Sequence, residues 1–145
     1  MREKDQKNFQ KENKNSDTLF REIQRATDGL FYVSETDAPV LAFRGTQVDQ
    51  LRRDTIIHQL DLKPEPKVEE TPFETFFDRL TAVKEWFGET QTAKAKKFLE
   101  LRKLLEENLR DLTVFRIGEI RLDIYAVGID EDGVLMGVTT KAVET

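Results

Sequence analysis

Apolar side chains recur at helical spacing near the start of the chain. The stretch opens at Asp17, a residue type that caps helix N-termini, and stops before Gly29, which suits the position just after a helix. The apolar positions within it are Leu19, Phe20, Ile23 and Ala26. This spacing is typical of the buried stripe of an amphipathic helix, and it predicts a first helix between Asp17 and Gly29.

Two further amphipathic helices are predicted in the middle of the chain. Residues 71–74 carry a strong start signal: Thr71 can cap, Pro72 suits the first helical position, and Glu74 can complete a capping box. The apolar stripe that follows consists of Phe73, Phe76, Phe77 and Leu80. A longer helix is expected over residues 91–108, and its apolar positions are Ala95, Phe98, Leu101, Leu105 and Leu109.

Shorter apolar stretches predict five strands. Residues 30–34 and 40–44 form the first two, joined by a short turn that contains Asp37 and Pro39. Three more follow the long helix, at residues 114–117, 120–127 and 134–143. The middle one alternates, so we expect one face to carry Ile120, Leu122, Ile124 and Ala126. A turn at residues 130–133 joins the last two strands.

Residues 46–62 leave two interpretations open, because their apolar positions permit a short helix while residues 55–57 could pair as a strand. The segment 63–67 is expected to be a loop, since Pro64 and Pro66 break either structure. The predicted helices and strands cluster rather than alternate along the chain. That order favours an α+β fold with a mostly antiparallel sheet.

The first fifteen residues differ in composition from the rest. They are rich in Lys, Glu, Asn and Gln, and Phe9 is the only large apolar residue after Met1. Such a segment cannot bury enough surface to offset its ordering entropy. We therefore expect a mobile tail over residues 1–15 and a single folded domain over residues 16–145.

The predicted domain is acidic. Residues 1–15 hold five basic and three acidic side chains, which leaves 18 basic and 25 acidic groups in residues 16–145, a balance of −7. An acidic surface repels phosphate backbones, so we expect no nucleic-acid binding. The same charge would speed association with a basic protein, although many proteins are mildly acidic simply for solubility.

The residues that most enzymes need are missing from the sequence. There is no cysteine, and the single histidine, His58, excludes a multi-histidine metal site. No nucleophile elbow or phosphate-binding glycine loop occurs. Residues 130–133 resemble a calcium loop but lack its spacing, which favours a hairpin turn. A magnesium site built from carboxylates alone is the remaining enzymatic option, and no informative spacing supports it. We expect no cofactor.

Three residues stand out from this scaffold. Glu35 directly follows an apolar strand and should project at a sheet edge or loop mouth. Trp86, the only tryptophan, lies between two predicted helices, and Thr145 closely follows an apolar strand. Each also has an ordinary interpretation: a solvated glutamate, a tryptophan that covers the core, and a frayed chain end.

Three stretches resemble the nuclease A inhibitor family. They are Ala26 to Glu35, Glu85-Trp86-Phe87, and the final strands from Phe115–Tyr125 through Lys141–Thr145, which include the terminal Glu144-Thr145 pair. The resemblance spans roughly residues 17–145 and is weakest over 46–70. It implies an α/β/α sandwich whose mostly antiparallel sheet is covered by helices.

The resemblance also implies a function. Members of the family block the active site of a DNA/RNA non-specific nuclease of the ββα-metal class. By similarity, Glu35 and Thr145 would reach the nuclease's catalytic metal, and Trp86 would pack at the interface. Glu85 and Glu144 belong to the same matching stretches and are included as partner-binding residues. The chain would have no metal of its own.

The sequence thus predicts a cytoplasmic inhibitor of a non-specific nuclease that is a monomer when free and not an enzyme. No membrane association is expected, because no apolar run is long enough to cross a bilayer. The alternative is a non-enzymatic binding module for another basic protein.

Overall fold

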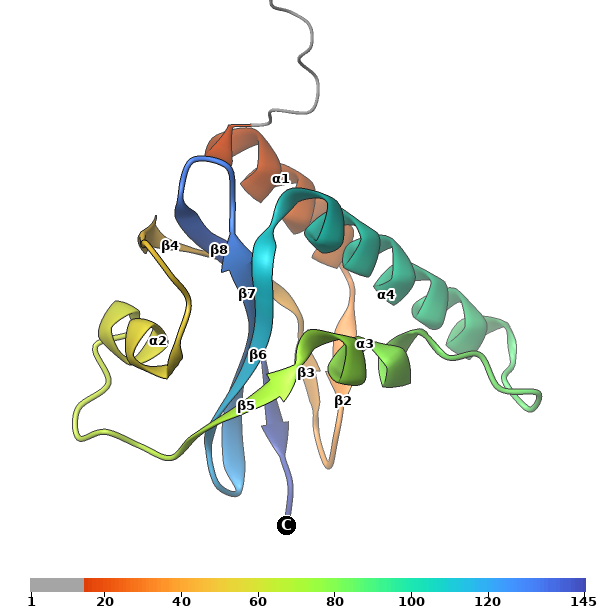
Figure 1. The fold of residues 1–145 in the computed structure, drawn as a ribbon. Coiled ribbons are helices and arrows are strands. Elements are labelled where there is room, and N and C mark those ends of the chain that lie inside the picture. Colours follow the sequence, from red (N-terminus) through yellow and green to blue (C-terminus); the bar gives the residue numbers. More distant parts are fainter. Residues whose placement is uncertain (1–14) are drawn as a thin grey trace, which may run out of the picture.

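The computed structural model describes residues 15–145, so the predicted tail lies outside the described residues except for Asn15. A five-stranded antiparallel sheet forms the centre of the molecule (Figure 1). In spatial order its strands are β4 (Leu41–Gln47), β8 (Val134–Val143), β7 (Arg121–Ile129), β6 (Arg110–Gly118) and β5 (Val68–Pro72). The meander β6–β7–β8 that the sequence predicted supplies its three inner strands.

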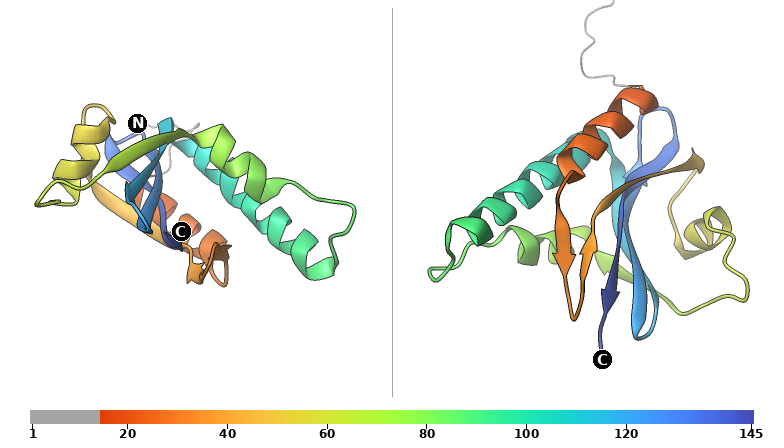
Figure 2. Two further views of the ribbon diagram at one scale, coloured as in Figure 1. Left: turned by 90° about the horizontal axis from the view of Figure 1, so that it is seen from below. Right: turned by 180° about the vertical axis from the view of Figure 1, so that it is seen from behind.

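Helices cover both faces of this sheet, which confirms the predicted α+β sandwich. One face carries α1 (Ser16–Thr27), α3 (Phe73–Thr81) and α4 (Glu89–Asn108), and the other carries α2 (Arg53–Gln59) (Figure 2). Residues 46–62, which left two interpretations open, therefore contain a helix. Residues 63–67 form a loop, as predicted.

The inner strands are buried on both faces because helices lie on each side of them. Val114 packs in the larger core with the aromatic stripe of α3, whereas its neighbour Phe115 packs in the smaller core with Ile56 of α2. Neighbouring residues of a strand point to opposite faces, so adjacent apolar residues fill two separate cores. The predicted stripe of α4 is also confirmed: Ala95, Phe98, Leu101 and Leu105 are all buried.

A separate hairpin extends from the end of α1. Its strands are β2 (Phe31–Val33) and β3 (Asp37–Pro39). The prediction that Asp37 and Pro39 lie in a turn was wrong, because both belong to β3 and the turn is residues 34–36. The carbonyl of Pro39 accepts a hydrogen bond from the Thr140 hydroxyl at 3.0 Å, which ties the hairpin to β8.

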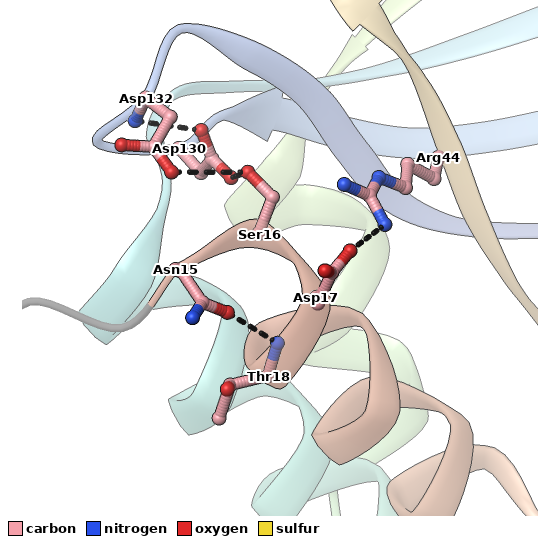
Figure 3. Close-up of polar contacts among 7 residues, drawn as sticks. All are labelled: Asn15, Ser16, Asp17, Thr18, Arg44, Asp130 and Asp132. Carbon is pink, nitrogen blue, oxygen red and sulfur yellow. Dashed lines mark hydrogen bonds and ion pairs between the residues drawn. The ribbon is translucent and has the colours of Figure 1, made fainter.

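The first helix begins earlier than predicted. Asn15 is its N-cap, and the Asn15 side chain accepts a hydrogen bond from the Thr18 backbone N–H at 2.8 Å (Figure 3). Asp17, the predicted cap, instead forms an ion pair with Arg44 of β4 at 2.7 Å. This tertiary contact competes for the Asp17 carboxylate and lowers its pKa through a hydrogen bond and charge attraction.

The predicted capping box at residues 71–74 is also absent. Thr71 and Pro72 pair with β6 as part of β5, and α3 begins at Phe73. β5 is an edge strand, where a proline without an N–H is tolerated. The predicted start of this helix is therefore correct to within two residues. Thr71 and Pro72, which were expected to begin the helix, pair in the sheet instead.

One residue of the predicted strand 120–127 does not face the core. Ile120 lies in the β6–β7 turn and is 57% exposed, whereas Leu122, Ile124 and Ala126 are buried as predicted. The alternation in the sequence starts one residue before β7 begins at Arg121. The turn residue therefore looked like a core position, although no layer covers it.

Candidate functional site

Three segments that are distant in the sequence meet at the lower end of the sheet in Figure 1: the β2–β3 turn, the β6–β7 turn and the residues after β8. Backbone hydrogen bonds join them. The Glu35 N–H donates to the Val143 carbonyl at 3.3 Å, and the Glu144 N–H donates to the Ile120 carbonyl at 2.9 Å. Val143 and Glu144 are therefore held from two sides at the point where pairing between β7 and β8 ends.

The structure brings together Glu35 and Thr145, two of the residues predicted as partner contacts. One oxygen of the Glu35 carboxylate accepts the Thr145 backbone N–H at 2.8 Å and the Thr145 hydroxyl at 2.7 Å. These two bonds lower the pKa of Glu35, the hydroxyl bond more than the backbone bond. Both residues are exposed, so a charged carboxylate is held in place at the surface.

No cation neutralises this carboxylate within the described part of the chain. The groups that stabilise the charged form of Glu35 are the two donors of Thr145, and both are neutral. Both hydrogen bonds from Thr145 go to Oε2 of Glu35, so they leave the other carboxylate oxygen, Oε1, unoccupied. Glu35 can therefore still offer negative charge and lone pairs to a partner.

Ser34 fixes the turn that carries Glu35. Its hydroxyl donates to the Thr36 carbonyl at 3.2 Å and accepts the Val143 N–H at 3.0 Å. The sequence interpretation placed Ser34 at the end of a strand and in the stretch Ala26 to Glu35 that resembles the family, but gave Ser34 no role of its own. Its position immediately before Glu35 was visible, but the contact with β8 could not be seen without the fold.

Glu144 lies beside this site but is already engaged within the chain. Its carboxylate forms an ion pair and a short hydrogen bond with the guanidinium of Arg116 on β6. The Arg116 side chain is only 17% exposed, while that of Glu144 is 43% exposed. Sequence reasoning did not find Arg116, because β7 separates its strand from β8 in the sheet.

Trp86 and Glu85 lie on a different part of the surface. They occupy the loop between α3 and α4, which projects sideways from the hairpin and the chain end in both Figure 1 and Figure 2. Trp86 is 76% exposed, and its ring contacts Phe87 edge to face at 6.1 Å between centroids. The interpretation of Trp86 as a cover for the core is therefore wrong.

The predicted site residues thus form two exposed groups, one around Glu35 and Thr145 and one around Trp86. Residues 17–145 match the family model described as nuclease A inhibitor-like protein. The chain belongs to the nuclease A inhibitor-like family. A comparison with curated proteins finds no match.

In this nuclease A inhibitor-like chain, exposed apolar side chains flank the group around Glu35. Val33 lies two residues before Glu35, and the Ile120 carbonyl oxygen accepts the hydrogen bond from the Glu144 N–H. Each is 57% exposed. Large apolar side chains beside a fixed polar group are typical of surfaces that contact other proteins. Sequence reasoning missed both, because Val33 belongs to a strand and Ile120 looked as if it did.

The acidic turn after β7 is a hairpin turn, as predicted. Asp130 accepts hydrogen bonds from the Asp132 N–H and the Ser16 hydroxyl (Figure 3). It also accepts one from the Val134 N–H. These bonds occupy both oxygens of the buried Asp130 carboxylate and tie the turn to the start of α1.

Among residues 15–145, no group of three His, Asp or Glu side chains is placed to hold a metal. None of the helices in that range is both long and apolar enough to cross a membrane.

Proposed function

We propose that this chain inhibits a DNA/RNA non-specific, metal-dependent nuclease by occluding its active site, with Glu35 and Thr145 as the inserted group. The observation that carries the proposal is the Glu35 carboxylate, which Thr145 holds charged and fixed at an exposed end of the sheet. Membership of the nuclease A inhibitor-like family supports a nuclease as the partner.

The chemistry of such a nuclease suits this group. Its active site binds a phosphate with a metal ion and cationic side chains, so it attracts a carboxylate. Glu35 can occupy the phosphate position without offering a bond that the enzyme can break. Because the two bonds from Thr145 already restrict Glu35, binding should lose less side-chain entropy than binding by a free glutamate would.

A second contact is proposed at the α3–α4 loop. A tryptophan that is 76% exposed is unusual unless a partner covers it, and tryptophan is among the residue types that dominate interface energies. Glu85 lies next to it and is also exposed, so it would meet the rim of the same basic surface. Two separated contacts would fix both the position and the orientation of the inhibitor.

Under this proposal the chain acts by binding and is not itself an enzyme. Its negative charge, −5 over the whole sequence, repels nucleic acid and attracts the basic surface with which a nuclease binds its substrate. Inhibition would therefore weaken as the salt concentration rises, because exposed charges are screened.

The direct test is a titration of nuclease activity. A ββα-metal nuclease is assayed on plasmid DNA and on RNA with increasing amounts of the purified chain, with bovine serum albumin as a protein control. We expect complete inhibition near an equimolar ratio, and no degradation when the chain is assayed alone. Undiminished activity of the nuclease from the same organism at a tenfold excess of folded chain would reject the proposal. It would leave another basic protein as the partner.

A further inference from the structure

The residues that follow β8 depend on contacts outside the sheet ladder. Pairing between β7 and β8 ends at Val143, and pairing between β4 and β8 ends at Thr139. Beyond Val143 the chain is held by individual hydrogen bonds and an ion pair, not by strand pairing. The Glu144 N–H donates to the Ile120 carbonyl at 2.9 Å, and Thr145 donates twice to Glu35.

Arg116 supplies the only ion pair among the interactions that hold this segment in the described part of the chain. It reaches across β7 from β6 to the carboxylate of Glu144. The Arg116 side chain is largely covered, so its conformation is restricted before the pair forms. A planar, restricted guanidinium holds a carboxylate in a more defined geometry than a flexible lysine would.

We infer that Arg116 and Glu144 are positioning residues, which hold Thr145 against Glu35 and do not themselves contact the nuclease. This inference rests on the proposed function. It changes the role of Glu144, which the sequence suggested as a partner-binding residue. Of the two glutamates, Glu35 is the one whose carboxylate remains for the partner, because the carboxylate of Glu144 is already paired with Arg116.

The two roles of Glu144 predict different behaviour in a double-mutant cycle. If the pair positions Thr145, Arg116→Gln and Glu144→Gln each remove the same interaction. Each should then weaken inhibition about fivefold, and the double variant should also weaken it about fivefold, not about 25-fold. If Glu144 contacts the nuclease directly, Glu144→Gln should weaken inhibition while Arg116→Gln leaves it near the wild-type value.

A spectroscopic measurement separates positioning from a general loss of stability. We expect the backbone ¹⁵N order parameter of Thr145 to fall in Arg116→Gln, from a rigid value of about 0.85 toward about 0.6. The order parameter of Val138, in the paired part of β8, should stay unchanged.

Arg102→Gln is a matched control. The Arg102 side chain is 16% exposed, close to the 17% of Arg116. It pairs with Asp78 of α3 at 2.9 Å and with Glu106 of its own helix at 3.2 Å. Arg102→Gln should therefore lower the melting temperature at least as much as Arg116→Gln does, without weakening inhibition or changing the order parameter of Thr145.

The wild-type titration comes first and keeps the two proposals separate. A wild-type chain that does not inhibit refutes the proposed function. A wild-type chain that inhibits refutes only the positioning inference if Arg116→Gln inhibits equally well, or if the two substitutions weaken inhibition multiplicatively. An unchanged order parameter of Thr145 in Arg116→Gln would also overturn that inference.

Discussion

The Glu35 carboxylate accepts hydrogen bonds from both the backbone N–H and the hydroxyl of Thr145. Glu35 and Thr145 are 110 positions apart in the sequence. Neither residue is buried, so this contact adds little to the core. What it does is hold one carboxylate charged and oriented at the surface. The contact prepares Glu35 for a partner under the proposed function.

Substitution of Glu35 should separate binding from folding. Glu35→Ala should weaken inhibition by about 2 kcal/mol or more, as removal of a central interface residue does. Glu35→Lys should be worse, because it brings a positive charge to a cationic site. The melting temperature should barely change, since Glu35 is exposed. Asp49→Ala, which removes an exposed acidic side chain before α2, is the control for net charge. Full inhibition by both Glu35 variants would show that Glu35 is merely solvated.

The pKa of Glu35 should depend on the Thr145 hydroxyl. The hydrogen bonds from Thr145 lower this pKa below its ordinary value of 4.5, so their contribution to stability is present above that value and is lost as the pH falls through the lowered pKa. An NMR titration of the Glu35 side-chain carboxyl should show the low value. In Thr145→Val the pKa should rise toward 4.5, because the largest cause of the shift has been removed. The same pKa in both proteins would contradict the geometry.

An extension after Thr145 should abolish inhibition. It would replace the Thr145 carboxylate by an amide and place new chain beside Glu35, where the nuclease is expected to dock. The same tag before Met1 should be harmless, because α1 begins at the opposite end of the sheet (Figure 1). Both forms should melt at the wild-type temperature. Equal inhibition in a nuclease titration would exclude a role for the free end.

Trp86 should act as a second, independent contact. Trp86→Ala should weaken inhibition by about 2 kcal/mol and leave the melting temperature unchanged, because the side chain is exposed in the free protein. Its effect should add to that of Glu35→Ala, since the two groups lie on separate segments. Calorimetric titration of the nuclease with the single and double variants measures the binding free energy of each and shows whether the two losses add. A strongly non-additive result would mean that the two groups act as one site.

The apolar residues beside Glu35 should also contribute to binding. Ile120→Ser and Val33→Ser should each weaken inhibition by about 1 kcal/mol, because each removes apolar surface that a partner would cover. Leu99→Ser is the control, since Leu99 is a partly exposed residue of α4. If the control weakens inhibition as much as the other two, the apolar residues around Glu35 have no special role.

Local patterns in the sequence predicted the helices α3 and α4 and the meander β6–β7–β8. The stripe Phe73, Phe76 and Phe77 and the alternation from Leu122 to Ala126 both report which side of an element faces the core. That information lies within a few neighbouring residues. The resemblance to the nuclease A inhibitor family was also available from the sequence, and the family match over residues 17–145 confirmed it.

The sequence by itself therefore determined the element types, the main core and the family, because each depends on short-range spacing or on motifs. Only the tertiary structure decided which surface residues meet. Ile120 continues an apolar alternation but lies in a turn, and Thr71 follows the pattern of a helix cap but pairs in a sheet. The pairs Glu35–Thr145 and Arg116–Glu144 depend on how strands are ordered in space. The physical reason is that strand pairing and ion pairing join residues far apart in the chain, and no local pattern encodes which distant partner a polar side chain will find.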